Sequence, residues 1–255
     1  MVSDLRILKG RNKIYFASDL HLGIPNNKES LEREKRFVSW LDKIKEDAAE
    51  IFLLGDIFDF WFEYKRVVPR GFTRLLGKIS EITDSGIPVH FFTGNHDIWV
   101  FDYLPEETGV ILHRKPFSYE FQNKKFFLAH GDGLGSGDKG YKFLKKIFTN
   151  RFLQWMYSRL HPNFALWFAS KLSEDSRLSG VSADFLGEEK EWLVQYACEV
   201  SENEKFDFFI FGHRHIPIDI RLKNHSRFIY LGDWISHFTY GVFDGKDFAL
   251  KTFNQ

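Results

Sequence analysis

The chain has 255 residues, and its 35 basic and 35 acidic side chains give a formal net charge of zero before the ten histidines are counted. This balance provides no overall positive field, so it argues against a nucleic-acid partner. With 44% hydrophobic and 27% charged residues, the composition is that of a globular protein, and it excludes a disordered or fibrous chain.

The cysteine content and the apolar runs bear on the cellular compartment. The single cysteine, Cys198, can form no intramolecular disulfide, which favours a reducing environment. Charged residues interrupt the first ten positions, unlike a signal peptide, and no run of 18 apolar residues predicts a transmembrane helix. We therefore expect a cytoplasmic protein.

Short apolar runs bounded by glycine or turn residues predict buried strands at 14–17, 51–54, 89–93, 126–129, 208–211 and 228–231. Residues 31–49 and 72–82 lie between the early runs and show the apolar spacing of helices. This alternation predicts an α/β fold in a single domain over residues 1–255. Residues 119–129 and 228–253 are richer in strand patterns, which favours a mixed sheet or two packed sheets.

Residues 137–200 have a mostly helical pattern, and we expect them to form a helical cap inserted within the domain. From Lys139 to Lys171 there are seven basic residues, no acidic ones, and many interleaved aromatic residues. In one interpretation the aromatic side chains are helix core and the lysines a solvated face. In the other, the rings form a cleft for acyl chains and the basic residues meet anionic lipid headgroups. The lack of acidic residues favours the second.

Polar motifs follow five of the predicted strands and are the strongest signal in the sequence. They are Ser18-Asp19-Leu20-His21, Gly55-Asp56, Gly94-Asn95-His96-Asp97, His130-Gly131-Asp132 and Gly212-His213-Arg214-His215. Side chains at the carboxyl ends of several strands converge on one crevice in an α/β fold. The histidines outside these motifs are interpreted as ordinary core or surface residues: His90, His113, His161, His225 and His237.

The residue types in the motifs indicate a metal site. Aspartate, asparagine and histidine without thiolates suit divalent ions such as Mn²⁺, Mg²⁺, Fe²⁺ or Zn²⁺. Seven candidate ligands exceed the needs of one tetrahedral site, so we expect two metal ions: Asp19, His21, Asp56, Asn95, His130, His213 and His215. A shared carboxylate can hold two cations about 3.5 to 4 Å apart, a spacing suited to in-line displacement at phosphorus. Asp56 is the candidate for this shared carboxylate.

Three further residues in or near the motifs receive indirect roles. Asp59 and Asp132 are expected to support the ligands or cap loops rather than bind metal. Arg214, which separates His213 from His215, is interpreted as a spacer.

The order of the motifs resembles that of the calcineurin-like metallophosphoesterase superfamily over roughly residues 14–216. The resemblance implies a four-layer αββα sandwich. It places one metal ion on Asp19, His21, Asp56 and His215, and the other on Asp56, Asn95, His130 and His213. It further implies that His96 protonates the leaving oxygen or stabilises the developing charge, held in orientation by Asp97.

Within this superfamily, the chain is similar to the UDP-2,3-diacylglucosamine diphosphatases of the lipid A pathway. The similarity rests on residues 55–61, on His130-Gly131-Asp132 with the following Asp138 and Gly140-Tyr141, and on the aromatic, basic insert. It implies cleavage of a pyrophosphate to give UMP and 2,3-diacylglucosamine 1-phosphate, with Mn²⁺, at the cytoplasmic face of the inner membrane. Within the insert, we expect the substrate to be contacted by Tyr141, Lys171 and Arg177.

One position departs from the diphosphatase pattern. The best-known members of that family carry arginine where this chain has His96, and histidine there is the general superfamily residue. An alternative function is therefore hydrolysis of another phosphodiester or nucleotide substrate. A non-catalytic scaffold of the same fold is a further alternative, but it would be expected to have lost ligands, and all seven candidate positions bear competent side chains.

Overall fold

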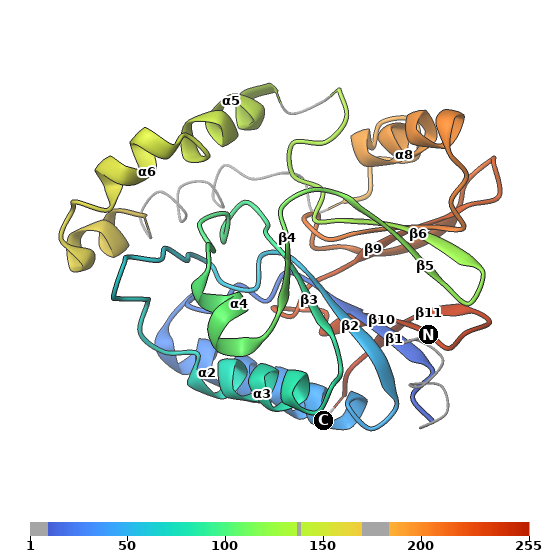
Figure 1. The fold of residues 1–255 in the computed structure, drawn as a ribbon. Coiled ribbons are helices and arrows are strands. Elements are labelled where there is room, and N and C mark those ends of the chain that lie inside the picture. The colour runs from blue at the N-terminus through green and yellow to red at the C-terminus, as the bar shows by residue number, and fades with distance from the viewer. Residues whose placement is uncertain (1–9, 137–138, 170–183, 255) are drawn as a thin grey trace.

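The computed structural model describes residues 10–136, 139–169 and 184–254 of the chain. Their strands form two sheets (Figure 1). From edge to edge, the first sheet contains β11 (Phe248–Thr252), β10 (Thr239–Phe243), β1 (Lys13–Ala17), β2 (Ala48–Leu54), β3 (Val89–Phe92) and β4 (Ile111–His113). Strands β1 to β4 are parallel, whereas β10 pairs antiparallel with both β1 and β11.

The second sheet is also mixed. It contains, in order, β5 (Phe117–Phe121), β6 (Lys124–Ala129), β7 (Phe208–Phe211), β9 (Arg227–Leu231) and β8 (Pro217–Arg221). The three central strands are parallel, and the two edge strands run antiparallel to their neighbours. Two packed sheets, each of mixed direction, confirm the expectation from the strand-rich segments.

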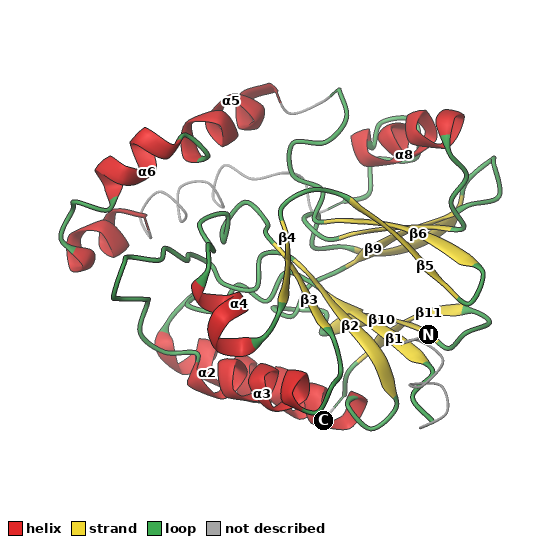
Figure 2. Cartoon of the chain, viewed as in Figure 1, coloured by secondary structure: helices red, strands yellow, loops and turns green. Residues whose placement is uncertain are grey.

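The two sheets pack face to face, and helices cover their outer faces (Figure 2). Helices α2 (Asn27–Ile44) and α3 (Thr73–Asp84) cover the first sheet, and α4 (Tyr103–Thr108) packs beside α3. Side chains alternate along each strand, so Ile14 and Phe16 enter the core between the sheets while Tyr15 and Ala17 face the helices. With α8 (Trp192–Asn203) on the second sheet, the molecule is the expected helix–sheet–sheet–helix sandwich.

Helix α2 differs from the predicted helix 31–49 at both ends. It begins earlier because the side chain of Asn26 caps its first turn, accepting hydrogen bonds from the backbone of Lys28 and Glu29. It ends earlier because Ala48 and Ala49 belong to β2, every residue of which is buried. Burial of β2 between β1 and β3 therefore outweighs the good helix propensity of these alanines.

The predicted insert 137–200 divides into two parts. Helices α5 (Lys139–Phe148) and α6 (Arg151–Tyr157) and the helical residues 162–169 lie above one end of the sandwich (Figure 1). Helix α8 instead packs its buried residues Leu193, Val194 and Ala197 against the outer face of the second sheet, where Phe127 and Phe209 lie. Residues 192–200 thus pack as the fourth layer of the sandwich, apart from α5 and α6.

A chain of polar side chains crosses three strands of the first sheet. His90 of β3 is buried, and its Nε2 lies 3.1 Å from Oε2 of Glu50 on β2. Its Nδ1 lies 2.9 Å from Nε2 of His113 on β4. A carboxylate only accepts, so His90 donates to Glu50 and accepts from His113. Burial, together with the neighbouring His90, lowers the pKa of His113 to about 4, which keeps that ring neutral.

We expect Glu50→Ala to reduce the free energy of unfolding by about 1–3 kcal/mol, because the buried Nε2–H of His90 loses its acceptor. Glu50→Gln retains a side-chain acceptor and is expected to cost less. Urea denaturation monitored by circular dichroism measures both changes. Equal stability of Glu50→Ala and the unmodified chain would contradict this hydrogen-bond chain.

Candidate metal centre

The candidate site lies where the carboxyl ends of strands from both sheets meet. Asp19 follows β1, Asp56 follows β2 and Asn95 follows β3 in the first sheet, while His130 follows β6 and His213 follows β7 in the second. Parallel strands deliver their carboxyl ends to one edge of a sheet, and the two sheets open at the same edge. The structure therefore brings together ligand-type side chains that are far apart in the sequence.

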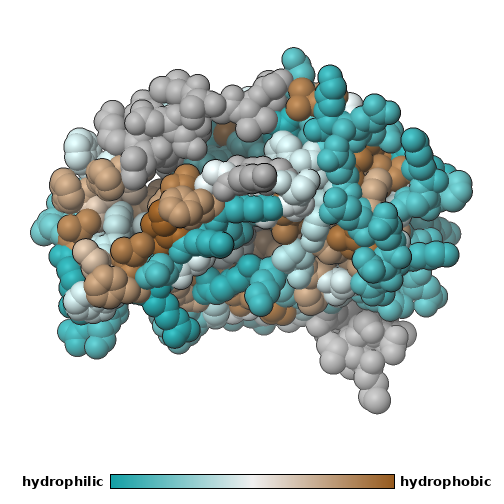
Figure 3. Space-filling view, turned by 90° about the horizontal axis from the view of Figure 1, so that it is seen from above, coloured by the Kyte–Doolittle hydropathy of each residue, from teal (hydrophilic) through white to brown (hydrophobic). Residues whose placement is uncertain are grey.

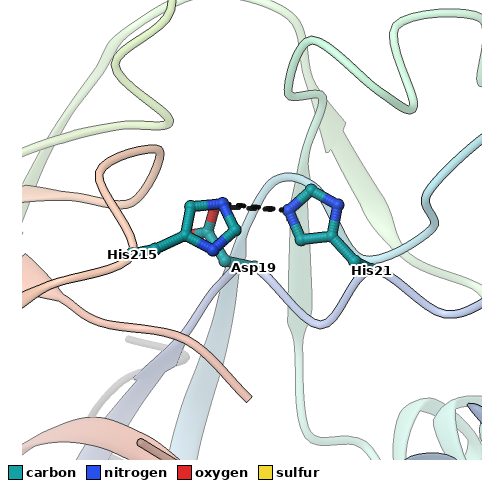
Figure 4. Close-up of side chains that lie close together, drawn as sticks. All are labelled: Asp19, His21 and His215. Carbon is teal, nitrogen blue, oxygen red and sulfur yellow. Dashed lines mark hydrogen bonds and ion pairs between the residues drawn. The ribbon is translucent and has the colours of Figure 1, made fainter. Parts of the chain in front are cut away.

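The first group of side chains consists of Asp19, His21 and His215 (Figure 4). Nε2 of His21 lies 3.9 Å, and Nε2 of His215 lies 3.5 Å, from Oδ1 of Asp19. The two ring nitrogens lie 3.2 Å apart. Three ligand-type atoms therefore surround one point at the distances expected of side chains that share a cation.

The second group consists of Asp56, His130, His213 and Asn95. Nε2 of His130 lies 3.2 Å from Oδ2 of Asp56 and 3.2 Å from Oδ1 of Asn95, and Nδ1 of His213 lies 3.0 Å from that amide oxygen. On the other side of its ring, Nδ1 of His130 donates to the carbonyl of Leu54 at 2.8 Å. This bond fixes the tautomer of His130 and leaves Nε2 with a lone pair that can bind a metal.

Asp56 connects the two groups through one oxygen. Its Oδ2 lies 3.6 Å from Nε2 of His21 in the first group and 3.2 Å from Nε2 of His130 in the second. Its other oxygen, Oδ1, accepts from the backbone N–H of His96 at 2.9 Å, which fixes the rotation of the carboxylate. This is the geometry required of a carboxylate shared by two cations.

Electrostatics at the site favour positive charge. Burial on its own would lower the pKa of His21, but the carboxylates of Asp19, Asp59 and Asp56 outweigh it and raise that pKa to about 10. The pKa of His130 is likewise raised to about 10, because Asp56 more than offsets the effect of burial. The buried carboxylates that favour positive charge on these two rings would favour divalent cations in the same way, and a bound cation would displace the proton from Nε2.

The backbone of the site is strained. Five expected ligands have positive φ angles between 45° and 70°, a region that residues with a Cβ rarely adopt: Asp19, His21, Asp56, His213 and His215. Backbone hydrogen bonds between neighbouring loops hold this conformation, including Asp19 N–H to the Gly55 carbonyl at 3.1 Å. The backbone at Gly94 also lies close to Asp56, and a Cβ at Gly94 would collide with the carboxylate of Asp56.

The sequence led us to expect that Asp97 orients His96, but the contacts of the His96 ring are with Asp59. Nδ1 of His96 lies 2.9 Å from the carbonyl oxygen and 3.8 Å from the carboxylate of Asp59. The same carboxylate lies 3.3 Å from Nδ1 of His21. A carbonyl oxygen only accepts, so Nδ1 of His96 carries a proton. Burial lowers the pKa of His96.

Asp97 acts on the backbone. Its two carboxylate oxygens accept hydrogen bonds from the N–H groups of Gly94, at 2.7 Å, and Ile57, at 2.9 Å. Complete burial and the nearby Asp56 raise the pKa of Asp97 to about 7. Asp97 thus connects the loop that carries Asn95 to the loop that carries Asp56. Its carboxylate binds these backbone groups, which replaces the expected role of orienting the His96 ring.

Asp233 is a site residue that the sequence analysis missed. It follows β9, and its Oδ2 lies 3.5 Å from Nδ1 of His215. Its Oδ1 accepts from the backbone N–H groups of Ile235, Ser236 and His237. Although burial acts to raise the pKa of Asp233, these bonds and His215 hold it well below the usual range. The glycine and aspartate at 232–233, directly after a predicted strand, repeat the Gly55-Asp56 signal and could have identified it.

The expected substrate contacts lie in different places. Tyr141 is on α5, and its hydroxyl donates to Oδ2 of Asp132 at 2.8 Å. Nζ of Lys145 pairs with the same buried carboxylate at 2.5 Å. Asp132 therefore anchors α5 two residues beyond the ligand His130. Lys171 and Arg177 lie outside the described residues.

The donor set fits two divalent cations. Aspartate oxygens, an amide oxygen and imidazole nitrogens, with no thiolate among the described side chains of the site, suit hard to borderline ions. Imidazole nitrogens, carboxylate oxygens and an amide oxygen of these side chains also face one another at 3.0 to 3.9 Å. A cation in each group would satisfy these donors.

Comparisons with known proteins agree with this geometry. Residues 12–217 match the calcineurin-like phosphoesterase family. The chain is 41% identical over 256 residues to a UDP-2,3-diacylglucosamine hydrolase of Porphyromonas gingivalis, covering 95% of this chain and 98% of the relative. It is 30% identical to a protein of the same name from Vibrio vulnificus, covering 87% of this chain and 89% of the relative. The chain therefore belongs to the calcineurin-like phosphoesterase family.

Proposed function

We propose that this phosphoesterase hydrolyses the pyrophosphate of UDP-2,3-diacylglucosamine to UMP and 2,3-diacylglucosamine 1-phosphate, using two Mn²⁺ ions. The observation that carries the phosphoester chemistry is the position of Asp56, whose Oδ2 faces both groups of ligands. The substrate is supported by the relatives, two of which bear this activity in their names and align with most of the chain.

Each set of residues has a distinct role in the proposed reaction. Asp19, His21 and His215 would hold one ion, Asn95, His130 and His213 the other, and Asp56 both. Two cations there would neutralise charge on the phosphoryl oxygens and lower the pKa of an attacking water. The buried carboxylates keep the ligands in place. The loop at Gly94 passes so close to Asp56 that it leaves no room for a side chain at position 94.

His96 is the proposed proton donor for the leaving oxygen. Its Nδ1 donates to the Asp59 carbonyl, so we assign the proton transfer to Nε2. Donation from Nε2 requires the doubly protonated ring. Burial lowers the pKa of His96, so that form is a stronger acid but is less populated near neutral pH. Asp59 is a positioning residue in this scheme because it contacts the rings of both His21 and His96.

His96 also supports a second candidate function. Histidine at this position is the general superfamily pattern, so a simpler phosphodiester or a nucleotide is the alternative substrate. The two candidates share the metal site and differ in the products formed.

The cap offers an apolar surface for an acylated substrate and the membrane that contains it. Large side chains on α6 and in the following helical residues are about half exposed or more, including Phe152 at 63%, Trp155 at 52% and Trp167 at 58%. Apolar residues gather at one end of the upper face (Figure 3). Such an exposed aromatic patch is typical of a membrane or ligand interface. Among the described helices, none combines the length and hydropathy needed to cross a bilayer.

The basic residues of the cap do not all face outward. Lys145 pairs with Asp132, and Lys142 donates to the carbonyl of Gly135. Lys146, Arg151 and Arg159 are exposed. We infer that these three cations and the exposed aromatic rings meet anionic headgroups, which would place the enzyme on the cytoplasmic face of the inner membrane. Tyr141 is included in the proposal as a substrate contact because it adjoins Asp132, and Lys171 and Arg177 remain sequence-based candidates.

We expect Asp56→Ala to reduce turnover by about 10³-fold or more, because both metal ions lose a ligand and several kcal/mol of transition-state stabilisation disappear. Phosphorus NMR of UMP release from UDP-2,3-diacylglucosamine in Mn²⁺ measures the loss. Asp42→Ala, which removes a half-exposed carboxylate of α2 that pairs with Lys45 and Lys78, is the matched control and should retain full activity. Retention of most activity by a folded Asp56→Ala would contradict the proposed site.

His96→Gln is expected to lower kcat by about 10²- to 10⁴-fold with little change in Mn²⁺ affinity, since His96 donates a proton and binds no metal. The loss should be much smaller for bis-p-nitrophenyl phosphate, whose leaving group needs no protonation. Parallel assays of both substrates make the comparison. An equal loss on both would exclude His96 as the proton donor. Cleavage of the nitrophenyl diester alone by the unmodified chain would favour the alternative substrate.

Replacing Lys146, Arg151 and Arg159 together by glutamine is expected to weaken binding to vesicles of phosphatidylglycerol and phosphatidylcholine roughly 100-fold at low salt, because each of the three cations contributes about 1 kcal/mol. Vesicle co-sedimentation measures the change. The control replaces three exposed basic residues outside the cap: Arg221 and Lys223 at the end of β8, and Lys246 between β10 and β11. Equal weakening by both triple variants, or by neither, would contradict a membrane surface on the cap.

A further inference from the structure

Arg214 separates two metal-ligand candidates, yet it is not a solvent-facing spacer. Its side chain is only 1% exposed and lies against Trp192 at the start of α8 and the segment before it. There Nη2 lies 2.9 Å from Oε1 of Glu191, whose side chain is completely buried. A buried ion pair is retained at a desolvation cost, so its position calls for an explanation beyond the spacing of the ligands.

Glu191 gathers further donors around this pair. Its Oε1 also accepts from the backbone N–H of Leu186 at 3.2 Å, and its Oε2 accepts from the hydroxyl of Tyr230 at 3.0 Å. Arg214 in turn donates to the carbonyl of Asp184 at 3.1 Å. The pair therefore joins three parts of the molecule: the turn that carries two ligands, strand β9, and residues 184–191 ahead of α8.

The pair reaches His213 through Trp192. The guanidinium of Arg214 lies 5.3 Å from the centre of the Trp192 ring, and this ring meets the His213 ring edge-on with centroids 6.2 Å apart. Trp192 is the first residue of α8, directly after Glu191. The ion pair thus fixes the indole that packs against one face of a ligand.

The turn held by the Arg214–Glu191 ion pair is strained. His213 and His215 both have positive φ angles, 70° and 56°, and Arg214 donates its backbone N–H to the carbonyl of Gly212, two residues earlier. Residues with side chains adopt this conformation only when their surroundings enforce it. Because the Arg214 side chain is anchored on the opposite side of the turn, the two imidazoles on either side of it are directed toward the metal groups.

We propose that Arg214 and Glu191 are positioning residues that set the orientation of His213 and His215 and thereby the affinity of the site for divalent cations. The inference rests on the metal site of the proposed function but not on its substrate. Supporting contacts of metal ligands are typically worth 10- to 100-fold in metal affinity.

The test is a Mn²⁺ titration followed by electron paramagnetic resonance of the free ion, with no substrate present. Arg214→Gln and Glu191→Gln are each expected to raise the Mn²⁺ dissociation constant by about 10- to 100-fold. Arg214→Lys keeps the charge and loses the fork of donors, so we expect an intermediate value. It also serves as the second variant if Arg214→Gln fails to fold. Activity of the variants should recover as Mn²⁺ is raised, with the KM for substrate unchanged.

Arg227→Gln is the matched control. Arg227 at the start of β9 also pairs with two carboxylates, Asp219 and Asp247, but it lies at the opposite end of the strand from the site. Its loss should lower the melting temperature and leave the Mn²⁺ affinity unchanged. The proposal is overturned if Arg214→Gln and Arg214→Lys lower the melting temperature in the same way and bind Mn²⁺ as the unmodified chain does.

The titration separates this inference from the proposed function. A chain that binds Mn²⁺ and loses affinity on Arg214→Gln, but releases no UMP, would refute the substrate and support the positioning pair. An unmodified chain that binds no divalent ion would overturn both.

Discussion

The face-to-face packing of the two sheets is the constraint on which the site depends. Phenylalanine side chains from both sheets fill the space between them, including stacked rings of Phe16 and Phe126 with centroids 6.0 Å apart. This packing sets the distance between the carboxyl ends of β1, β2 and β3 on one side and of β6 and β7 on the other. The ligands sit on short loops at those ends, so their spacing follows from the core rather than from the loops alone.

The loops store strain that the rest of the fold maintains. Left-handed backbone at five ligands directs their side chains inward, and this conformation costs of order 1–3 kcal/mol at each residue. Asp97 and the Arg214–Glu191 pair are buried and bind parts of these loops from outside the metal groups. The charged side chains around the site thus divide into those that face the cations and those that hold the backbone behind them.

The sequence predicted which side chains gather at the candidate site better than it predicted the residues that support them. Asp19, Asp56, Asn95 and His130 are found because they follow apolar runs, and a strand end is a local pattern. Asp97 and Arg214 were misjudged because their partners, the backbone of Ile57 and the side chain of Glu191, lie 40 and 23 residues away. Which helix supplies the predicted fourth layer depends on distant partners in the same way. The helical pattern of 192–203 is visible in the sequence, but the sheet face on which it packs depends on tertiary structure.

The distance in sequence between the ligands has a consequence for how the protein matures. An oxygen of Asp19 accepts a hydrogen bond from the backbone of His213, 194 residues later, so the two halves of the centre come from opposite ends of the chain. During ribosomal synthesis, Asp19, Asp56 and Asn95 emerge long before the second sheet exists. A nascent chain offers only part of the ligand set, and tight cation capture must wait until β7 has docked. At the proposed site, metal acquisition would therefore follow the synthesis of both sheets and would stabilise their packing.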